Sequence, residues 1–271
     1  MSSVGSLSRK LIPDFAYSRL RALRGDYQYQ ERLGKLTPPW TAYGLLMAVR
    51  AAKKYGNRSI SVAEFGVANG RGLRRMTSLA ERLSSQSGVK IHVYGFDTSE
   101  GLPAPEDYRD HPELFGEGDY PMQNFDQLKA EINGRAELVI GDIRQIGSLD
   151  KILAESAPLG FASVDVDIYT SSKSALRLIA DSKPESLLPT VGLHFDDVWS
   201  EWGYNRFAGE LLSIEEINDE YPLRKIDRDR YVDYWHGGFS PWHDAMYMLH
   251  AFDHPDRFKS LRSDPQVIAQ S

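Results

Sequence analysis

The stretch VAEFGVANGRGL, residues 62–73, joins a short apolar strand to a glycine-rich loop. Glu64 stands on the strand itself, and Gly66, Gly70 and Gly72 complete an E-x-G-x-x-x-G-x-G pattern. Glycines at such a turn let the backbone approach a ligand closely, and a helix directly after the loop would point its N-terminus at that ligand. The spacing differs from the dinucleotide pattern G-x-G-x-x-G, so it favours an adenosyl ligand without a pyrophosphate.

Apolar segments of strand length alternate along the chain with amphipathic segments of helix length. Near-continuous apolar strands are typical of a parallel sheet that helices cover on both faces, so the pattern predicts an α/β fold. The expected strands are residues 61–65, 91–96, 136–140, 161–166 and 191–195, with two more near 223–226 and 245–251. The main expected helices are residues 39–55, residues 73–83, and two that follow Thr170 and Trp202.

Composition restricts the class of protein. The 271 residues, 41% hydrophobic and 26% charged, suit one large core with an appendage. A net charge of -6 with dispersed basic residues argues against nucleic-acid binding, and the lack of cysteine leaves only hard metal ligands. No signal peptide or membrane span is expected. We expect an N-terminal extension over residues 1–37, a main domain over 38–255 and a loosely held tail over 256–271.

The glycine loop resembles motif I of the class I S-adenosylmethionine-dependent methyltransferases. The resemblance implies a Rossmann-like fold with seven mostly parallel strands, helices on both faces and an antiparallel last strand. It also implies S-adenosylmethionine as the cofactor. On this pattern the loop residues that bind the cofactor are Glu64, Gly66, Ala68, Asn69, Gly70 and Gly72.

The second and third expected strands also lead into acids. In VYGFDTSEGLP, Asp97 can accept hydrogen bonds from the ribose hydroxyls of an adenosyl ligand, with Thr98 beside it. In ELVIGDIRQI, the resemblance makes Asp142 an acceptor for the adenine amino group and Ile143 an apolar wall for the ring. Capping of the turn that follows is the structural alternative for both acids.

Four carboxylates follow the fourth and fifth expected strands. FASVDVDIYTSS contains Asp165 and Asp167, and VGLHFDDVWSEWGY contains Asp196 and Asp197. Because parallel strands end at one edge of a sheet, these acids should converge, and gathered like charges bind a cation or raise a pKa. Oxygen ligands suit Mg²⁺, and Mn²⁺ or Ca²⁺ less well. The alternative is that the acids only cap the next helices.

The segments GFDTSEGLP, FGEGDY and DVDIYTSSKSAL and the D-D pair together resemble the macrocin and sugar O-methyltransferase family, over about residues 60–200. In that family a D-G-D-L-Y-E-S-T motif and a later D-D pair hold Mg²⁺ near the substrate hydroxyl. The resemblance therefore implies Asp165, Asp196 and Asp197 as metal ligands. Val166 departs from the glycine that is usual in the first motif.

Methyl transfer to a hydroxyl needs a group that accepts the hydroxyl proton. Asp167 matches the second acid of the family motif and is our candidate for this base, with Asp165 as the alternative. His236 and His243 lie in glycine- and proline-rich segments, so they could line an acceptor pocket, and His243 is a third catalytic candidate. His194, inside an apolar strand, is expected to be a hydrogen-bonded core residue.

The sequence thus favours a cytoplasmic, Mg²⁺-dependent O-methyltransferase that acts on a small hydroxylated molecule, a sugar or a secondary metabolite. An NAD(P)-dependent oxidoreductase and a metal-independent methyltransferase are the alternatives, and a protein that keeps the fold without catalysis is a further one. No nucleic-acid or membrane partner is expected. The sequence leaves open whether the chain forms a homo-oligomer.

Overall fold

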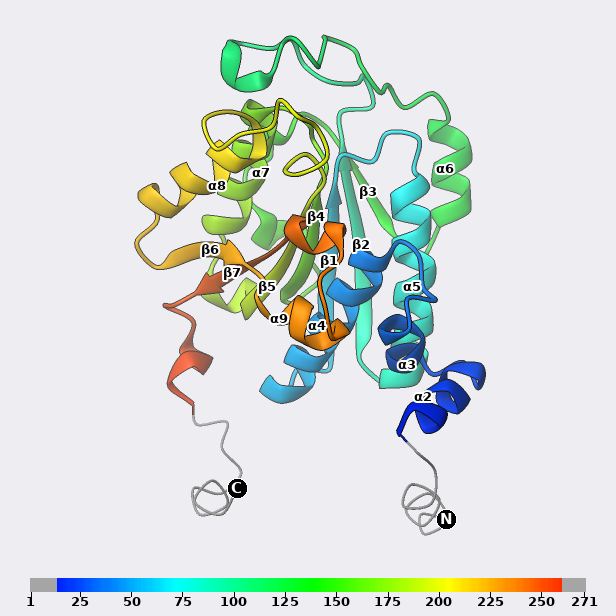
Figure 1. The fold of residues 1–271 in the computed structure, drawn as a ribbon. Coiled ribbons are helices and arrows are strands. Elements are labelled where there is room, and N and C mark those ends of the chain that lie inside the picture. Colours follow the sequence, from blue (N-terminus) through cyan, green and yellow to red (C-terminus); the bar gives the residue numbers. More distant parts are fainter. Residues whose placement is uncertain (1–13, 260–271) are drawn as a thin grey trace.

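The computed structural model describes residues 14–259, and one seven-stranded sheet lies at its centre (Figure 1). The strand order is β3-β2-β1-β4-β5-β7-β6. The first five of these strands are parallel, and β7 runs antiparallel to both of its neighbours, which confirms the predicted fold and its antiparallel last strand. The strands are β1 (Ser59–Phe65), β2 (Lys90–Asp97), β3 (Glu137–Ile140), β4 (Leu159–Val164), β5 (Leu187–Phe195), β6 (Arg224–Arg228) and β7 (Met246–Ala251).

Alternate side chains of each strand enter two separate cores. In β1, Ile60 and Val62 join one hydrophobic cluster, while Ala63 and Phe65 join the other, as the two-residue period of a strand requires. Helices α4 and α5 contribute to the first core and α7 and α8 to the second, so helices cover both faces of the sheet (Figure 1). The helices are α2 (Asp14–Leu23), α3 (Tyr27–Arg32), α4 (Pro39–Tyr55), α5 (Arg71–Ser87), α6 (Phe125–Ile132), α7 (Tyr169–Ala180), α8 (Gly209–Glu220) and α9 (Tyr231–His236).

Most predicted elements are confirmed, with one clear difference. The helix expected after Thr170 is α7, whereas the helix expected after Trp202 begins only at Gly209. The intervening segment has only turns and bends, so no helix follows the D-D pair directly. Residues 1–13 of the expected N-terminal extension and 260–271 of the expected tail lie outside the described residues. Among residues 14–259, none of the helices has both the length and the apolar character that crossing a bilayer requires.

The buried carboxylate of Glu31 joins helix α3 to helix α9. Its Oε2 accepts a hydrogen bond of 2.7 Å from Trp235 Nε1, and its Oε1 lies 2.8 Å from His236 Nε2. Replacing Glu31 by Ala leaves the buried indole N–H without a partner, so we expect the free energy of unfolding to fall by about 1–3 kcal/mol. Urea unfolding of wild type, Glu31→Ala and the milder Glu31→Gln measures this, and an unchanged midpoint for Glu31→Ala would contradict it.

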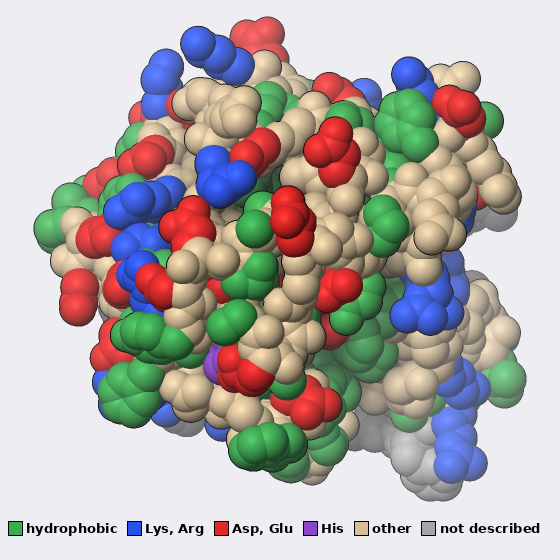
Figure 2. Space-filling view, turned by 90° about the horizontal axis from the view of Figure 1, so that it is seen from above, with side chains coloured by type: hydrophobic (Ala, Val, Ile, Leu, Met, Phe, Trp, Pro, Cys, Tyr) green, Lys and Arg blue, Asp and Glu red, His purple; other side chains and the backbone are tan. Residues whose placement is uncertain are grey.

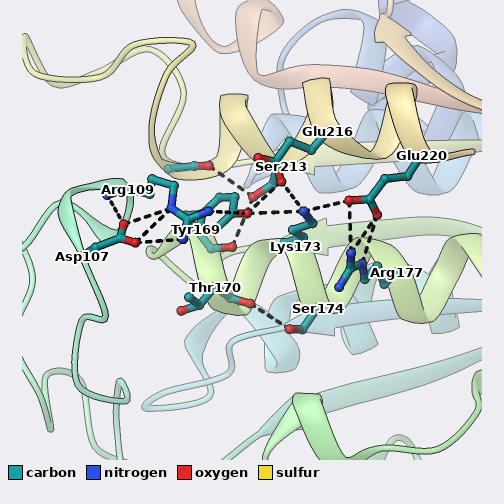
Figure 3. Close-up of polar contacts among 11 residues, drawn as sticks. Asp107, Arg109, Tyr169, Thr170, Lys173, Ser174, Arg177, Ser213, Glu216 and Glu220 are labelled. Carbon is teal, nitrogen blue, oxygen red and sulfur yellow. Dashed lines mark hydrogen bonds and ion pairs between the residues drawn. The ribbon is translucent and has the colours of Figure 1, made fainter.

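The long connection after β2 is fastened to helix α7 by polar contacts, and Tyr169 of α7 in turn contacts α8 (Figure 3). In η2 (Tyr108–Asp110), the Arg109 guanidinium lies 4.5 Å from the ring centroid of Tyr169 and donates to its hydroxyl at 3.1 Å. Tyr169 in turn donates to Glu216 of α8 at 2.7 Å. The fully buried carboxylate of Asp110 accepts from the Thr170 amide at 2.8 Å. These contacts hold the connection beside the carboxyl ends of the strands.

Candidate active site

The carboxyl ends of β1, β2, β4 and β5 open into one cavity of about 1490 Å³. Carboxyl ends of parallel strands are the usual place for ligands in such sheets. The volume exceeds the roughly 300–1,000 Å³ of a typical small-molecule pocket, which leaves room for a cofactor and a second molecule. Figure 2 looks down on this end of the molecule and shows acidic side chains spread over the face, with basic and apolar side chains among them.

Two glycines of the loop that lines the cavity lie in close contact with neighbouring backbone and side-chain atoms. Gly66 has φ +84°, and a Cβ added there would lie 1.7 Å from the backbone oxygen of Asp165. A Cβ on Gly72 would lie 1.9 Å from Glu64 Oε1. Any side chain at these two positions would therefore overlap a neighbouring atom, so only glycine fits there.

Glu64 is buried at the end of β1, with 6% of its surface exposed. Its Oε2 has no hydrogen-bond partner among the described residues, although a buried carboxylate oxygen ordinarily has one. Burial, and next the nearby charge of Asp97, raise the pKa of Glu64 to about 8. A buried acceptor of this kind, on the cavity wall, is suited to a ligand that donates a hydrogen bond.

Asp97 organises the loop that it faces. Its Oδ2 accepts from the amides of Val67 and Ala68 at 2.7 and 2.8 Å, and its Oδ1 accepts from Ser99 at 2.6 Å. The turn-capping interpretation is thus realised, and the sequence did not predict the link to residues 67 and 68. Each carboxylate oxygen can accept more than one hydrogen bond, so Asp97 can still accept from a ribose. Thr98 donates to the Gly101 carbonyl at 2.9 Å.

The remaining predicted cofactor residues also line the cavity. Asp142 caps the turn that follows β3, and its Oδ2 is paired with Arg144 Nη2 at 2.7 Å, an ion pair that the sequence analysis did not anticipate. Ile143 lies beside it on the cavity wall. In the glycine loop, Ala68 has φ +45° and Asn69 Oδ1 accepts from the Arg71 amide at 3.0 Å. The structure therefore brings nine of the ten predicted cofactor residues to one cavity. The tenth, Gly70, lies between residues of the loop that line the cavity.

Strand register brings the acids together. Phe65 of β1 pairs with Val164 of β4, and Val164 pairs with Phe195 of β5, so the residues that follow these strands share one level. Asp165, Asp167 and Asp197 can each place a carboxylate oxygen within 4.8 Å of the others. Such an all-oxygen set is what a hard divalent cation prefers.

Asp196 lies beside this group, where its charge raises the pKa of Asp165, Asp167 and Asp197, and its place in the metal set stays a prediction. Its side chain is half exposed on the cavity wall, with Oδ1 3.9 Å from His194 Nε2. Asp167, which was predicted as a base and not as a metal ligand, joins the cluster at a tight turn. The Ile168 amide donates to the Val166 carbonyl at 2.6 Å, and Asp167 between them has φ +61°, a γ-turn that is strained for a residue with a side chain.

The clustered acids have raised pKa values. Burial, and then the charges of neighbouring aspartates, raise the pKa of Asp165 well above its usual range and that of Asp167 to about 7. Burial raises the pKa of Asp197 to about 6, although a hydrogen bond from Tyr204 opposes the shift. Without a cation, the folded protein therefore holds protons here that the unfolded chain releases.

This proton uptake predicts how stability depends on pH. A carboxyl with a raised folded pKa contributes stability below its unfolded pKa, near 4, and that contribution is lost as pH rises through the folded pKa. The melting temperature of metal-free protein should therefore fall between pH 5 and pH 8, the range set by Asp197 and Asp167. Added Mg²⁺ should raise the melting temperature again at pH 8, because a ligand that binds only the folded state stabilises that state. A melting curve in EDTA that is flat with pH would contradict this expectation.

Two residues of the site were missed by the sequence analysis. Glu210, fully buried at the start of α8, accepts from the Asp197 amide at 3.0 Å, and its Oε1 has no partner among the described residues. Tyr204 donates to Asp197 Oδ1. Both therefore hold Asp197 in position. No sequence pattern predicts either contact, because an irregular segment separates both residues from the end of β5.

The histidines are placed by other contacts. His194 is buried and its Nδ1 lies 3.0 Å from Ser163 Oγ, as expected for a hydrogen-bonded core residue, yet it also lines the cavity. His243, by contrast, is 1% exposed, lies outside the cavity lining and has Nδ1 2.7 Å from Asp233 Oδ1. His236 contacts Glu31. His243 thus lies apart from the cavity, and its catalytic role stays a prediction from the sequence.

No protein-family model and no curated protein matches the chain. Among solved structures, it is similar to CalS11, a calicheamicin methyltransferase, with 20% identity over 76% of this chain and 77% of that one and a TM-score of 0.49. It is similar to CmcI with Mg and SAM at 17% identity, over 75% and 70% of the two chains, with a TM-score of 0.40. A rRNA methylase from Streptococcus thermophilus gives 12% identity, 74% and 93% coverage and a TM-score of 0.36.

These likenesses are remote and concern the fold alone. The sheet order, the antiparallel β7 and the glycine loop at the end of β1 stand on the structure of this chain. By that order and that loop, the chain has the fold of the class I S-adenosylmethionine-dependent methyltransferases.

Proposed function

We propose that the chain is an S-adenosylmethionine-dependent and Mg²⁺-dependent O-methyltransferase that acts on a hydroxyl of a small molecule, a sugar or a secondary metabolite. One observation carries the proposal: the carboxylate cluster of Asp165, Asp167 and Asp197 lies in the same cavity as the glycine loop. The cytoplasmic location, the lack of nucleic-acid partners and the expected domain limits remain predictions from the sequence.

The residues of the glycine loop fit S-adenosylmethionine. Gly66 and Gly72 leave no room for side chains, so the loop can lie close to a ligand. Glu64 Oε2 is a buried acceptor without a partner, and Asp97 keeps acceptor capacity toward a ribose. Ile143 offers apolar surface on the same wall.

The carboxylate cluster fits a hard divalent cation. Its three members offer only oxygen atoms, and Asp197 Oδ2 is buried without a partner among the described residues. Burial and the charges of neighbouring aspartates, Asp196 among them, raise the pKa values of all three acids, and a cation would relieve that repulsion. Asp165, Asp167 and Asp197 would hold the ion, with Tyr204 and Glu210 fixing Asp197.

The chemistry follows from these positions. S-adenosylmethionine, when bound, would supply a methyl group on a sulfonium for transfer to the acceptor oxygen. Mg²⁺, when bound, lowers the pKa of a coordinated hydroxyl. Asp167 would accept the proton of the acceptor hydroxyl through the carboxylate oxygen that does not hold the ion, and Asp165 stays the alternative base.

Transfer of a labelled methyl group tests the proposal. Wild-type protein with methyl-labelled S-adenosylmethionine and a panel of sugars and phenolic metabolites should give O-methylated product in Mg²⁺ and none in EDTA. Mass spectrometry of the product identifies the methylated atom. Turnover that persists in EDTA and in Asp197→Asn would favour the metal-independent alternative, in which the aspartates only cap structure.

The oxidoreductase alternative has its own discriminator. The loop spacing lacks the G-x-G-x-x-G pattern that a pyrophosphate needs, so NAD should not bind. Thermal stabilisation by S-adenosylhomocysteine and none by NAD is the expected result. The reverse order would overturn the proposed function.

A further inference from the structure

One wall of the cavity is not used by the reaction outlined above. Trp40, at the start of α4, stacks on His194 with ring centroids 5.0 Å apart and planes 4° apart. His194 Nε2 lies 3.9 Å from Asp196 Oδ1, and the Arg71 guanidinium is close enough to counter the burial that raises the pKa of Asp196. We call Trp40, Arg71, Arg75, His194 and Asp196, all of which line the cavity, the arginine wall.

The two arginines are cations without ion-pair partners. Arg71 and Arg75 are one helical turn apart on α5, so they share one face, and both are exposed. No salt bridge within residues 14–259 involves either of them, whereas the cavity's other arginine, Arg144, is paired with Asp142. Two unpaired guanidinium groups in a cavity rich in carboxylates are suited to an anion.

His194 gives a second and independent indication of a ligand. It is 2% exposed, and its Nδ1 is engaged by Ser163 at 3.0 Å. Its Nε2 has no hydrogen bond within the described part of the chain, since the 3.9 Å to Asp196 is too long. Burial lowers the pKa of His194 to about 3, so the ring is neutral. A ring nitrogen on the cavity wall that has no hydrogen bond to the protein is able to bind a polar group of a ligand.

We propose that the arginine wall binds an anionic group of the acceptor molecule, a carboxylate or a phosphate. The inference deepens the proposed function and rests on it. Arg71 and Arg75 pair with the anion, and His194 Nε2 hydrogen-bonds to the same molecule. Asp119 and Glu117, elsewhere in the cavity, repel an anion, whereas Arg71 and Arg75 attract one. Because Asp196 adjoins Asp197 in sequence, an anion held there leaves the rest of the acceptor beside the carboxylate cluster.

A carboxylate could also come from the methionine part of the cofactor. S-adenosylhomocysteine carries that carboxylate and 5′-methylthioadenosine lacks it, so the two ligands separate the sources. If the arginine wall serves the acceptor, Arg71→Ala/Arg75→Ala binds both nucleosides as wild type does. A tenfold loss of affinity for S-adenosylhomocysteine alone would assign the arginines to the cofactor and overturn the proposal.

The direct test titrates sugars into full-length protein saturated with S-adenosylhomocysteine, in EDTA to exclude metal chelation. Glucose 1-phosphate and glucuronate carry the two candidate anions, and glucose is the neutral match. We expect at least one anionic sugar to bind about tenfold or more tightly than glucose, as charge-assisted contacts allow. This advantage should vanish in Arg71→Ala/Arg75→Ala and weaken as salt rises.

Arg19→Ala/Arg24→Ala is the matched control, because it removes the same charge from two exposed positions, one in α2 and one just after it, that do not line the cavity. It should keep the wild-type preference for the anionic sugar. Equal affinities for all three sugars, or a preference that survives in Arg71→Ala/Arg75→Ala, would overturn the proposal. The titration of S-adenosylhomocysteine comes first, and its failure would instead overturn the proposed function.

Discussion

Replacing Asp165 and Asp197 together by asparagine is expected to abolish Mg²⁺ binding. The two residues supply two of the three carboxylates whose oxygens lie within 4.8 Å of one another. Asparagine keeps the shape and removes the charge, so the affinity for Mg²⁺ should fall by about 100-fold or more. Methyl transfer should then fall by about 1,000-fold, which corresponds to roughly 4 kcal/mol of transition-state stabilisation.

The same variant should be more stable than wild type in EDTA at pH 8. It removes the charge of Asp197, which raises the pKa values of Asp165 and Asp167. Calorimetric titration of Mg²⁺ and thermal melting measure the two effects on one sample. Asp126→Asn/Asp219→Asn, at exposed positions outside the cavity lining, is the charge-matched control. Unchanged Mg²⁺ affinity in the cluster variant would remove the metal from the proposed mechanism.

Replacing Gly66 by Ala is expected to eliminate cofactor binding. The added Cβ would lie 1.7 Å from the Asp165 carbonyl oxygen, which is backbone and cannot rotate away. The end of β1 would have to move from the end of β4, and this would displace both the loop and Asp165. Affinity for S-adenosylhomocysteine should fall by about 100-fold or more, with a lower melting temperature.

Gly134→Ala separates the overlap from the backbone conformation. Gly134 has φ +71°, similar to Gly66, but nothing lies within 4 Å of the position of its Cβ. This control should lose only the roughly 1–2 kcal/mol of a left-handed alanine and keep full affinity for the cofactor. Equal binding by Gly66→Ala and wild type would show that no ligand approaches the loop closely.

Much of the fold could be predicted because its strands are apolar runs between helices. The predicted strand over residues 191–195 begins at Leu187 in the structure, and the other parallel strands deviate by one or two residues. Pro189 and Thr190 obscured the start of β5, since they interrupt its apolar run. The antiparallel β7 came from the family resemblance, because periodicity alone gives no strand direction.

The site residues could be predicted where a reactive side chain lies at or directly after the end of a strand. Glu64, Asp97 and Asp165 occupy the edge that parallel strands share, and register alone places them. The presence of Asp167 in the carboxylate cluster depends on a γ-turn at φ +61°, and no residue pattern predicts such a turn. Glu210 reaches Asp197 across an irregular segment, so only the folded chain shows it.

The central claim is that this cavity binds S-adenosylmethionine, and isothermal titration tests it most directly. S-adenosylmethionine and S-adenosylhomocysteine are titrated into the wild-type protein in Mg²⁺ and again in EDTA. We predict that both nucleosides bind, and that Mg²⁺ gives a further heat that Asp165→Asn/Asp197→Asn abolishes. Folded protein that binds neither nucleoside would contradict the account.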